Sequence, residues 1–162
     1  MNNRNALLMI SFVAALLVTS FAGAEQQLIQ NEHEAKWSDG PAMLPPGAKI
    51  DVVQGDPGGT ALYTARLNFP ANYKIPAHSH PTDERVTVLS GTLYMGMGDK
   101  LDSRGRTALT VGGFALMPAK MNHYAYTKTG TTILLHGMGP VEFIYVNPAD
   151  DPRNAGQALT AP

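Results

Sequence analysis

The sequence lacks cysteine, a strong net charge and, beyond its first 24 residues, any sustained helical period, and each absence excludes a class of protein. With no cysteine among 162 residues, no disulfide framework can hold the fold. The net charge is −1 at pH 7 and no basic stripe is present, so we expect no nucleic-acid partner. What the chain has instead is 16 glycines and 12 prolines, a density of turn-forming residues that is typical of many short strands in one small domain.

The longest apolar run lies at the N-terminus. Arg4 precedes an apolar stretch over residues 6–18, and small residues at 22–24 stand just before Glu25. This pattern predicts a secretory signal over residues 1–24, and therefore a periplasmic or secreted protein that has no membrane contact after cleavage. The alternative is an uncleaved anchor, because residues 5–24 form an uncharged stretch of nearly the ~20 residues that a bilayer needs.

The rest of the chain alternates short apolar segments with turns. Residues 25–46 are expected to form an N-terminal arm, and residues 61–69 carry apolar side chains at every odd position, the period of a half-buried strand. Further strands are expected at 50–54, 85–89, 92–97, 108–111, 114–117, 124–127, 131–136 and 141–146. This spacing favours an all-β barrel or sandwich over residues 47–148, followed by an irregular tail over 149–162.

Three of the five histidines and one glutamate form a candidate metal site. His78 and His80 are two positions apart, so in a strand both imidazoles point to one face, and Glu84 shares their even-numbered parity. His123 must come from another strand, which only a folded barrel or sandwich can bring near. By itself, a histidine pair on one strand face is more often a solvated surface feature. The neighbouring carboxylate, Asp83, has the opposite parity and is expected to face the turn.

The same residues carry a family resemblance. Residues 78–84, followed by Gly91, resemble the first signature of the cupin superfamily, although Asn72 stands where a glycine is usual. Residues 112–123 resemble the second signature, with Lys120 in place of a common glycine. The resemblance implies a double-stranded β-helix, or jelly roll. It also implies one divalent ion bound by His78, His80, Glu84 and His123.

The ligand set leaves both the ion and the reaction open. Three imidazoles and a carboxylate accept Mn, Fe, Ni, Cu or Zn. A chain that folds after export would take its ion from the periplasmic or external pool, where the order of affinities favours copper and zinc over manganese and iron. Four protein ligands on a six-coordinate ion leave two positions for a substrate oxygen and for water or O₂. The resemblance implies dioxygenases and isomerases among its precedents, and we expect a dioxygenase-like enzyme that acts on a small organic acid or enol. The alternative is a non-catalytic metal- or ligand-binding module, whose mark would be a barrel mouth plugged by methionine and tyrosine.

Two residues are candidates for proton transfer. Glu84 could carry a proton in addition to binding the ion. His136 follows the apolar residues 132–135 and could lie near the metal, but a hydrogen-bonded core histidine is the simpler interpretation.

Two further groups bear on the pocket and on assembly. Five methionines are expected around the barrel, either as adaptable packing or, less simply, as thioether ligands for copper: Met95, Met97, Met117, Met121 and Met138. Sheet edges need cover. Tyr124 and Tyr126 have the opposite parity to His123 and would place aromatic surface outside the barrel. We therefore expect a homodimer that uses one outer sheet face and part of the arm with Trp37.

Overall fold

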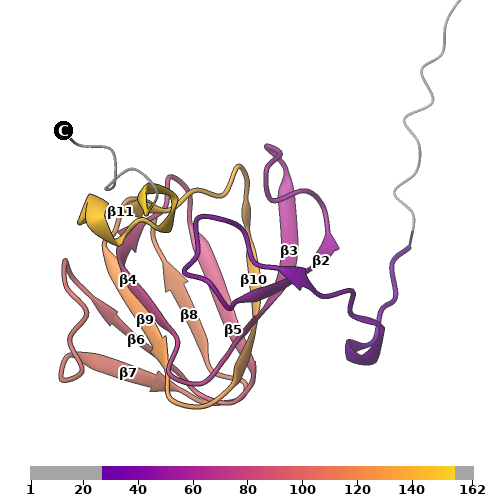
Figure 1. Cartoon of the computed structure of the whole chain (residues 1–162). Helices are drawn as coiled ribbons and strands as arrows, with labels where there is room; N and C mark the ends of the chain where they lie inside the picture. The colour runs from indigo at the N-terminus through magenta and orange to yellow at the C-terminus, as the bar shows by residue number, and fades with distance from the viewer. Residues whose placement is uncertain (1–26, 156–162) are drawn as a thin grey trace, which may run out of the picture.

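The computed structural model describes residues 27–155 and shows two antiparallel sheets packed face to face (Figure 1). Sheet A contains, in order across the sheet, β1 (Ser38–Asp39), β2 (Lys49–Gln54), β3 (Leu62–Phe69), β10 (Thr131–Met138), β5 (Glu84–Ser90) and β8 (Phe114–Met117). Sheet B contains β11 (Ile144–Tyr145), β4 (Lys74–Ser79), β9 (His123–Thr127), β6 (Leu93–Met97) and β7 (Arg106–Leu109). The all-β prediction is confirmed.

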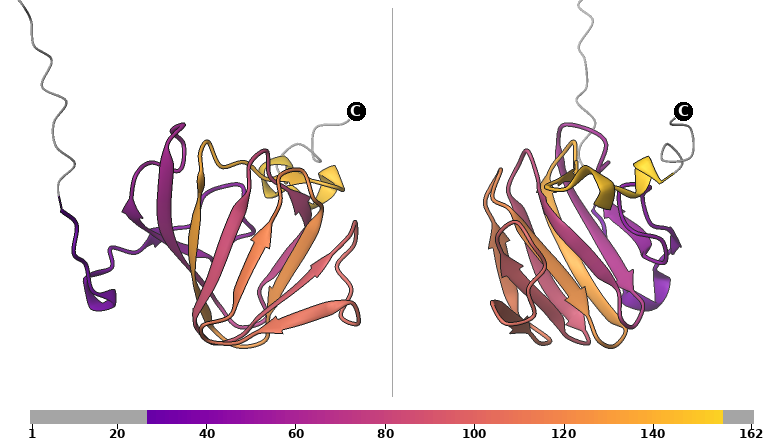
Figure 2. Two further views of the ribbon diagram at one scale, coloured as in Figure 1. Left: turned by 180° about the vertical axis from the view of Figure 1, so that it is seen from behind. Right: turned by 60° about the vertical axis from the view of Figure 1, so that its left-hand side comes forward.

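Three short 3₁₀ turns flank the sheets: η1 (Glu32–Glu34), η2 (Pro148–Asp150) and η3 (Pro152–Asn154). The views in Figure 2 show residues 27–37 outside the two-sheet body and the last two turns above one end of it. The predicted signal at 1–24 lies outside the described residues. Between residues 27 and 155, no helix has the length and apolar character needed to cross a bilayer.

The predicted alternation in β3 is what builds the core. Tyr63, Ala65, Leu67 and Phe69 are all buried between the sheets, as their odd-numbered spacing predicts. In the neighbouring strand β10, Ile133 pairs with Leu67 and contributes to the same apolar layer. Side chains from sheet B close the core from the other side: Ile75, Leu93, Met95 and Ala125. This apolar filling occupies the barrel and leaves the histidines at one end of it.

One irregularity in β4 decides which of its side chains face inward. Between Ile75 and His78 the register against β9 shifts by one residue, so that Ile75 pairs with Ala125 and His78 with His123. A bulge of this kind reverses the alternation. Ile75 and His78 therefore both reach the interior, although one has an odd number and the other an even one.

Two positions where the signatures usually have glycine adopt a left-handed backbone conformation in this chain. Asn72 has φ 60° and Lys120 has φ 65°, both in the left-handed region that glycine adopts most easily. The Lys120 amide donates a hydrogen bond to the carbonyl oxygen of His80 at 2.8 Å. The turn therefore keeps its shape without glycine, and it ties the second signature to the end of β4.

A buried ion pair lies on the outer face of sheet A, beneath the N-terminal arm. Asp51 is 2% exposed and Arg66 is 8% exposed. Arg66 Nη1 donates to Asp51 Oδ2 at 2.6 Å, and the amide of Lys36 donates to Asp51 Oδ1 at 2.9 Å. Gln30 Oε1 accepts a further, longer contact from Arg66 at 3.5 Å. The arm thus completes the polar contacts of this pair.

The outer face of sheet B differs from the sequence expectation. Tyr124 does point away from the interior, but it is only 1% exposed because the loop between β6 and β7 covers it. Its hydroxyl donates to the carbonyl oxygen of Asp102 at 2.8 Å, and its ring occupies the space that a Cβ at Gly96 would need. Tyr126 is also buried and stacks on Tyr94. The prediction that Tyr124 and Tyr126 offer aromatic surface to a partner is therefore wrong, while dimerisation itself stays a prediction.

Candidate metal centre

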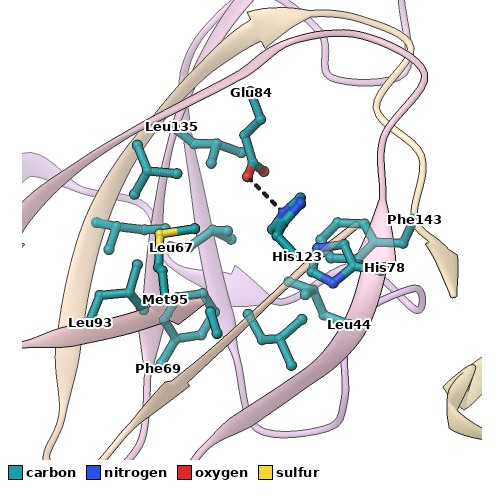
Figure 3. Close-up of a pocket in the computed structure, with 14 residues that line it drawn as sticks. Leu44, Leu67, Phe69, His78, Glu84, Leu93, Met95, His123, Leu135 and Phe143 are labelled. Atoms are coloured by element: carbon teal, nitrogen blue, oxygen red, sulfur yellow. Dashed lines mark ion pairs between the residues drawn. The ribbon is translucent and has the colours of Figure 1, made fainter. Parts of the chain in front are cut away.

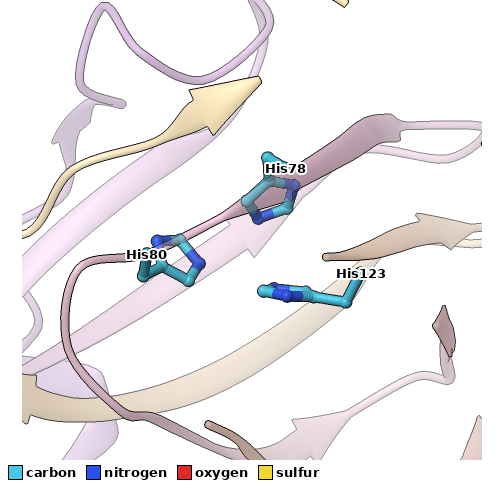
Figure 4. A group of neighbouring side chains, drawn as sticks. All are labelled: His78, His80 and His123. Carbon is cyan, nitrogen blue, oxygen red and sulfur yellow. The ribbon is translucent and has the colours of Figure 1, made fainter. Parts of the chain in front are cut away.

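Three buried histidines converge at one end of the barrel (Figure 4). His78 lies near the end of β4, His80 directly follows that strand, and His123 is the first residue of β9. Each can offer one ring nitrogen such that all three ligand atoms lie within 4.8 Å of one another. We call His78, His80 and His123 the histidine group. The sequence spacing predicted this convergence.

A backbone carbonyl fixes the orientation of each ring. Nδ1 of His78 is 2.7 Å from the oxygen of Pro76, Nδ1 of His80 is 2.6 Å from that of Glu142, and Nδ1 of His123 is 3.0 Å from that of Met121. A carbonyl oxygen only accepts, so each Nδ1 carries a proton, and in the neutral ring Nε2 presents a lone pair. Nε2 of His80 and of His123 is buried with no hydrogen-bond partner in the described part of the chain.

Glu84 approaches the histidine group from the opposite sheet (Figure 3). Its Oε1 lies 3.4 Å from Nε2 of His80, and its Oε2 lies 3.7 Å from Nε2 of His123. The set of atoms within 4.8 Å of one another contains the three histidines and not this carboxylate. Parity was the wrong reason for expecting Glu84 here, because a turn separates it from His80 and it begins β5 in sheet A.

Burial and mutual contact set the charges of these groups. Burial, together with the neighbouring His123 and His80, lowers the pKa of His78 to about 3, so this ring is neutral near pH 7. Burial alone would raise the pKa of Glu84, but His80 and His123 outweigh it and hold that pKa below its ordinary range. For His80, burial acts to lower the pKa and the Glu84 carboxylate raises it above its usual value. The end of the barrel therefore combines a neutral imidazole with an ionised carboxylate.

Phe143 covers the histidine group on one side. Its ring stacks on His78 with centroids 4.4 Å apart and meets His80 edge-on at 4.7 Å. Arg153 Nη2 donates to the carbonyl oxygen of Phe143 at 2.9 Å, and the Tyr145 hydroxyl donates to that of Met43 at 2.7 Å. These bonds hold the segment around Phe143 against the barrel. The sequence offers Phe143 only as one of several aromatic residues, of which one or two were expected to line the mouth of the pocket.

The interior beside the histidine group is apolar and narrow. A cavity of about 30 Å³ lies there, enough for a few water molecules at most. Besides His78, Glu84 and His123, the cavity is lined by Leu44, Leu67, Phe69, Ile75, Val86, Leu93, Met95, Ala125, Ile133, Leu135 and Phe143. Figure 3 shows Leu135, Leu67, Met95, Leu93 and Phe69 to the left of Glu84, His123 and His78.

The other sequence candidates lie elsewhere. His136 points to the outer face of sheet A, where its Nδ1 is 3.3 Å from Oγ1 of Thr64, so a place beside the metal is wrong for it. Its neighbour Leu135 has the inward parity instead. Asp83 accepts a hydrogen bond from the Ala119 amide at 3.0 Å and stays in the turn, as expected.

Comparison with known proteins identifies the fold. No protein-family model and no curated protein matches the chain. Among solved structures, it is similar to the polyketide cyclase RemF from Streptomyces resistomycificus (TM-score 0.63, 16% identity, covering 82% of this chain and 94% of that one). It is also similar to an acetylacetone dioxygenase from Acinetobacter johnsonii (0.59, 16%, 79% and 82%) and to an RmlC-like cupin from Shewanella frigidimarina (0.55, 16%, 70% and 91%). The chain therefore has the cupin fold that its two signatures predicted.

Proposed function

We propose that this cupin binds one divalent transition metal through His78, His80 and His123, with Glu84 as the fourth ligand. The observation that supports this most is the pair of buried, unpartnered Nε2 atoms on His80 and His123. Buried polar atoms without a partner destabilise a fold, and three lone pairs fixed by carbonyl bonds to Nδ1 are arranged as metal-binding histidines are. Nitrogen and oxygen donors of this kind suit Mn, Fe, Ni, Cu or Zn.

We propose further that the centre is that of a small-molecule metalloenzyme of dioxygenase type. A bound ion would act as a Lewis acid toward a substrate oxygen and, if redox-active, would also exchange electrons with O₂. The protein's own contribution would be a neutral His78, an anionic Glu84 and the Phe143 ring, which excludes water from one side. An acetylacetone dioxygenase among the structures of the same fold agrees with this class.

A non-catalytic binding module is the second candidate. The cavity of about 30 Å³ beside the histidine group is too small for most substrates, and Phe143 packs directly on two of the three histidines. These features favour storage or sensing of the ion alone. Turnover would then require entry from another side.

Residues 1–24 would direct the protein to the periplasm or the exterior, where it would take its ion from the external pool. The N-terminal sequence of the exported protein tests this, with Glu25 or a near neighbour expected first.

Metal content, followed by oxygen consumption, tests the proposed function. Elemental analysis should give about one ion per chain for the wild type and large losses for His78→Ala and His123→Ala. His136→Ala is the matched control, because this histidine lies outside the barrel and should keep its full metal content. Full occupancy in both site variants would overturn the metal assignment. Metal-dependent oxygen uptake with a panel of small oxygen-bearing compounds would separate the enzyme from the binding module.

A further inference from the structure

A second hollow adjoins the metal centre at the open edge of the barrel. It has a volume of about 380 Å³ and lies between β6 and β7 of sheet B and β8 of sheet A. We call it the methionine groove, and its lining residues are Met95, Gly96, Met97, Gly105, Thr107, Leu109, Phe114, Ala115, Leu116 and Met117. Its volume is within the ~300–1,000 Å³ of typical small-molecule pockets, which the inner cavity is not.

Strand register places this groove against the metal ligands. Met97 is the direct cross-strand partner of His123, and Met117 is that of Glu84. Directly opposed residues of antiparallel strands project from the same face, so both methionines border the centre. Met95 lines the groove and the inner cavity alike. The groove therefore ends at methionine side chains that border the centre, and no residue of the centre lines it.

The lining chemistry selects a kind of occupant. Among the described residues that form the groove, Thr107 alone has a polar side chain and none is charged. A charged group lodged in the groove itself would lose its hydration there without gaining a charged partner. Flexible thioether side chains adapt their shape to apolar groups. Met97, which is 47% exposed, lies where solvent meets the groove.

We propose that the methionine groove binds the uncharged, apolar end of a small molecule whose oxygen atoms reach the histidine group. This rests on the proposed metal function and adds that the part of the substrate remote from its metal-binding oxygens is apolar and uncharged. The main competitor for the groove is a second copy of the chain, because β7 and β8 are both edge strands.

Methyl NMR of the zinc-loaded protein with ¹³C-labelled methionine methyl groups tests the inference. The uncharged probe is 1-phenylbutane-1,3-dione, and its anionic counterpart is 4-(3-oxobutanoyl)benzoate, which keeps the dione and carries a carboxylate on the ring that the groove would hold. The dione should shift the methyl resonances of Met95, Met97 and Met117 and leave that of Met138, outside the groove, in place. The anion should bind at least tenfold more weakly.

A groove-filling variant separates the groove from the metal centre. Thr107→Trp should lower dione affinity at least tenfold and keep the zinc content of the wild type, whereas Thr110→Trp, an exposed position outside the groove, should change neither. Thr107→Leu replaces the tryptophan variant if that one does not fold.

The outcomes distinguish the two proposals. The groove proposal alone would be overturned if zinc binds and any one of three results is found. These are groove methyl resonances that do not move, an anion that binds as well as the dione or better, and a groove-filling variant that has no effect. Absent zinc binding with the same groove shifts would overturn the metal proposal and support the groove. Shifts that depend on protein concentration without any ligand, together with a doubled mass, would assign the groove to a second copy and overturn the inference.

Discussion

Two buried charged clusters lie on opposite faces of sheet A, and they differ in how well their polar atoms are paired. On the outer face, both carboxylate oxygens of Asp51 accept short hydrogen bonds, one from Arg66 and one from the Lys36 amide. On the inner face, Glu84 lies 3.4 Å and 3.7 Å from two imidazole nitrogens that have no hydrogen-bond partner among residues 27–155. The two clusters are therefore similarly buried, but the outer carboxylate has its hydrogen-bond partners and the two inner imidazole nitrogens do not.

That difference separates a structural cluster from a functional one. A cluster that serves stability should satisfy its own donors and acceptors, because an unpaired buried polar atom costs free energy. In the outer pair, both carboxylate oxygens of Asp51 are satisfied, one by Arg66 and one by the Lys36 amide of the N-terminal arm. The inner cluster leaves lone pairs facing one another, an arrangement that a cation would stabilise and an empty fold would not favour.

The largest expected effect comes from breaking the outer cluster. Asp51→Ala leaves the Arg66 charge buried and unpaired, so the free energy of unfolding should fall by about 3–5 kcal/mol. Urea denaturation measures the loss, and metal content per folded chain should remain that of the wild type. In the double variant Asp51→Leu with Arg66→Met, most of the stability should return. A loss of metal in Asp51→Ala that matches the His123→Ala variant would erase the distinction between the clusters.

The next effect comes from neutralising the inner carboxylate. Glu84→Gln keeps the shape of the side chain and removes its charge, so we expect metal affinity to fall about 10- to 100-fold. Competition with a chelator at fixed pH measures the change. Glu142→Gln is the control, because only the backbone oxygen of Glu142 contacts the site. If the metal affinity of Glu84→Gln equals that of the wild type, Glu84 is not a ligand and the three histidines alone bind the ion.

Acid should destabilise the metal-free inner cluster in a defined window. His78 has a folded-state pKa of about 3, below its ordinary value of 6.5, because burial and the other two histidines disfavour its charge. The unfolded chain therefore binds the extra proton first, and the stability from neutral His78 is complete above pH 6.5 and is lost as the pH falls toward 3. Urea denaturation with a chelator present, compared between pH 7 and 5, should show a shallower pH dependence for His78→Leu than for the wild type. Parallel curves for the two proteins would contradict this.

The smallest effect is expected in the backbone beside the inner cluster. Lys120 holds a left-handed conformation while its amide bonds to His80. Lys120→Gly should relieve about 1 kcal/mol of strain and lose part of that to the flexible unfolded chain, for a net gain of about 0.5 kcal/mol. Asn72→Gly should be nearly neutral, because asparagine tolerates this region well. Thermal unfolding of the two variants measures both changes in stability. Destabilisation by Lys120→Gly would show that the lysine side chain makes stabilising contacts of its own.

Much of the fold was readable from the sequence because alternation in strands is a local property. The odd-numbered residues of β3 face the core as their pattern predicts, and the spacing of His78, His80 and His123 predicted their convergence. What failed depended on contacts between distant segments. The bulge after Ile75 is visible only against β9, and nothing in the sequence near Tyr124 shows that the β6–β7 loop covers it.

The same limit explains the missed and misplaced site residues. Phe143 reaches the histidine group because its segment folds back over β4, which no periodicity encodes. Backbone carbonyl oxygens orient the histidine rings, and every residue has one. The residue type therefore gives no information on where these oxygens lie. His136 follows a run of apolar residues, yet it faces outward because its neighbour Leu135 has the inward parity.

The central position of β10 in sheet A has a consequence for how the chain folds. β10 lies between β3 and β5 and pairs with both, although it follows them by more than forty residues along the chain. Until residues 131–138 pair with them, β3 and β5 each keep one unpaired edge. Before then, few contacts between residues that are near in sequence stabilise these two strands. Refolding should therefore be slow for a chain of this size. The yield of refolded protein should fall as protein concentration rises, because unpaired strand edges of separate molecules can pair with each other.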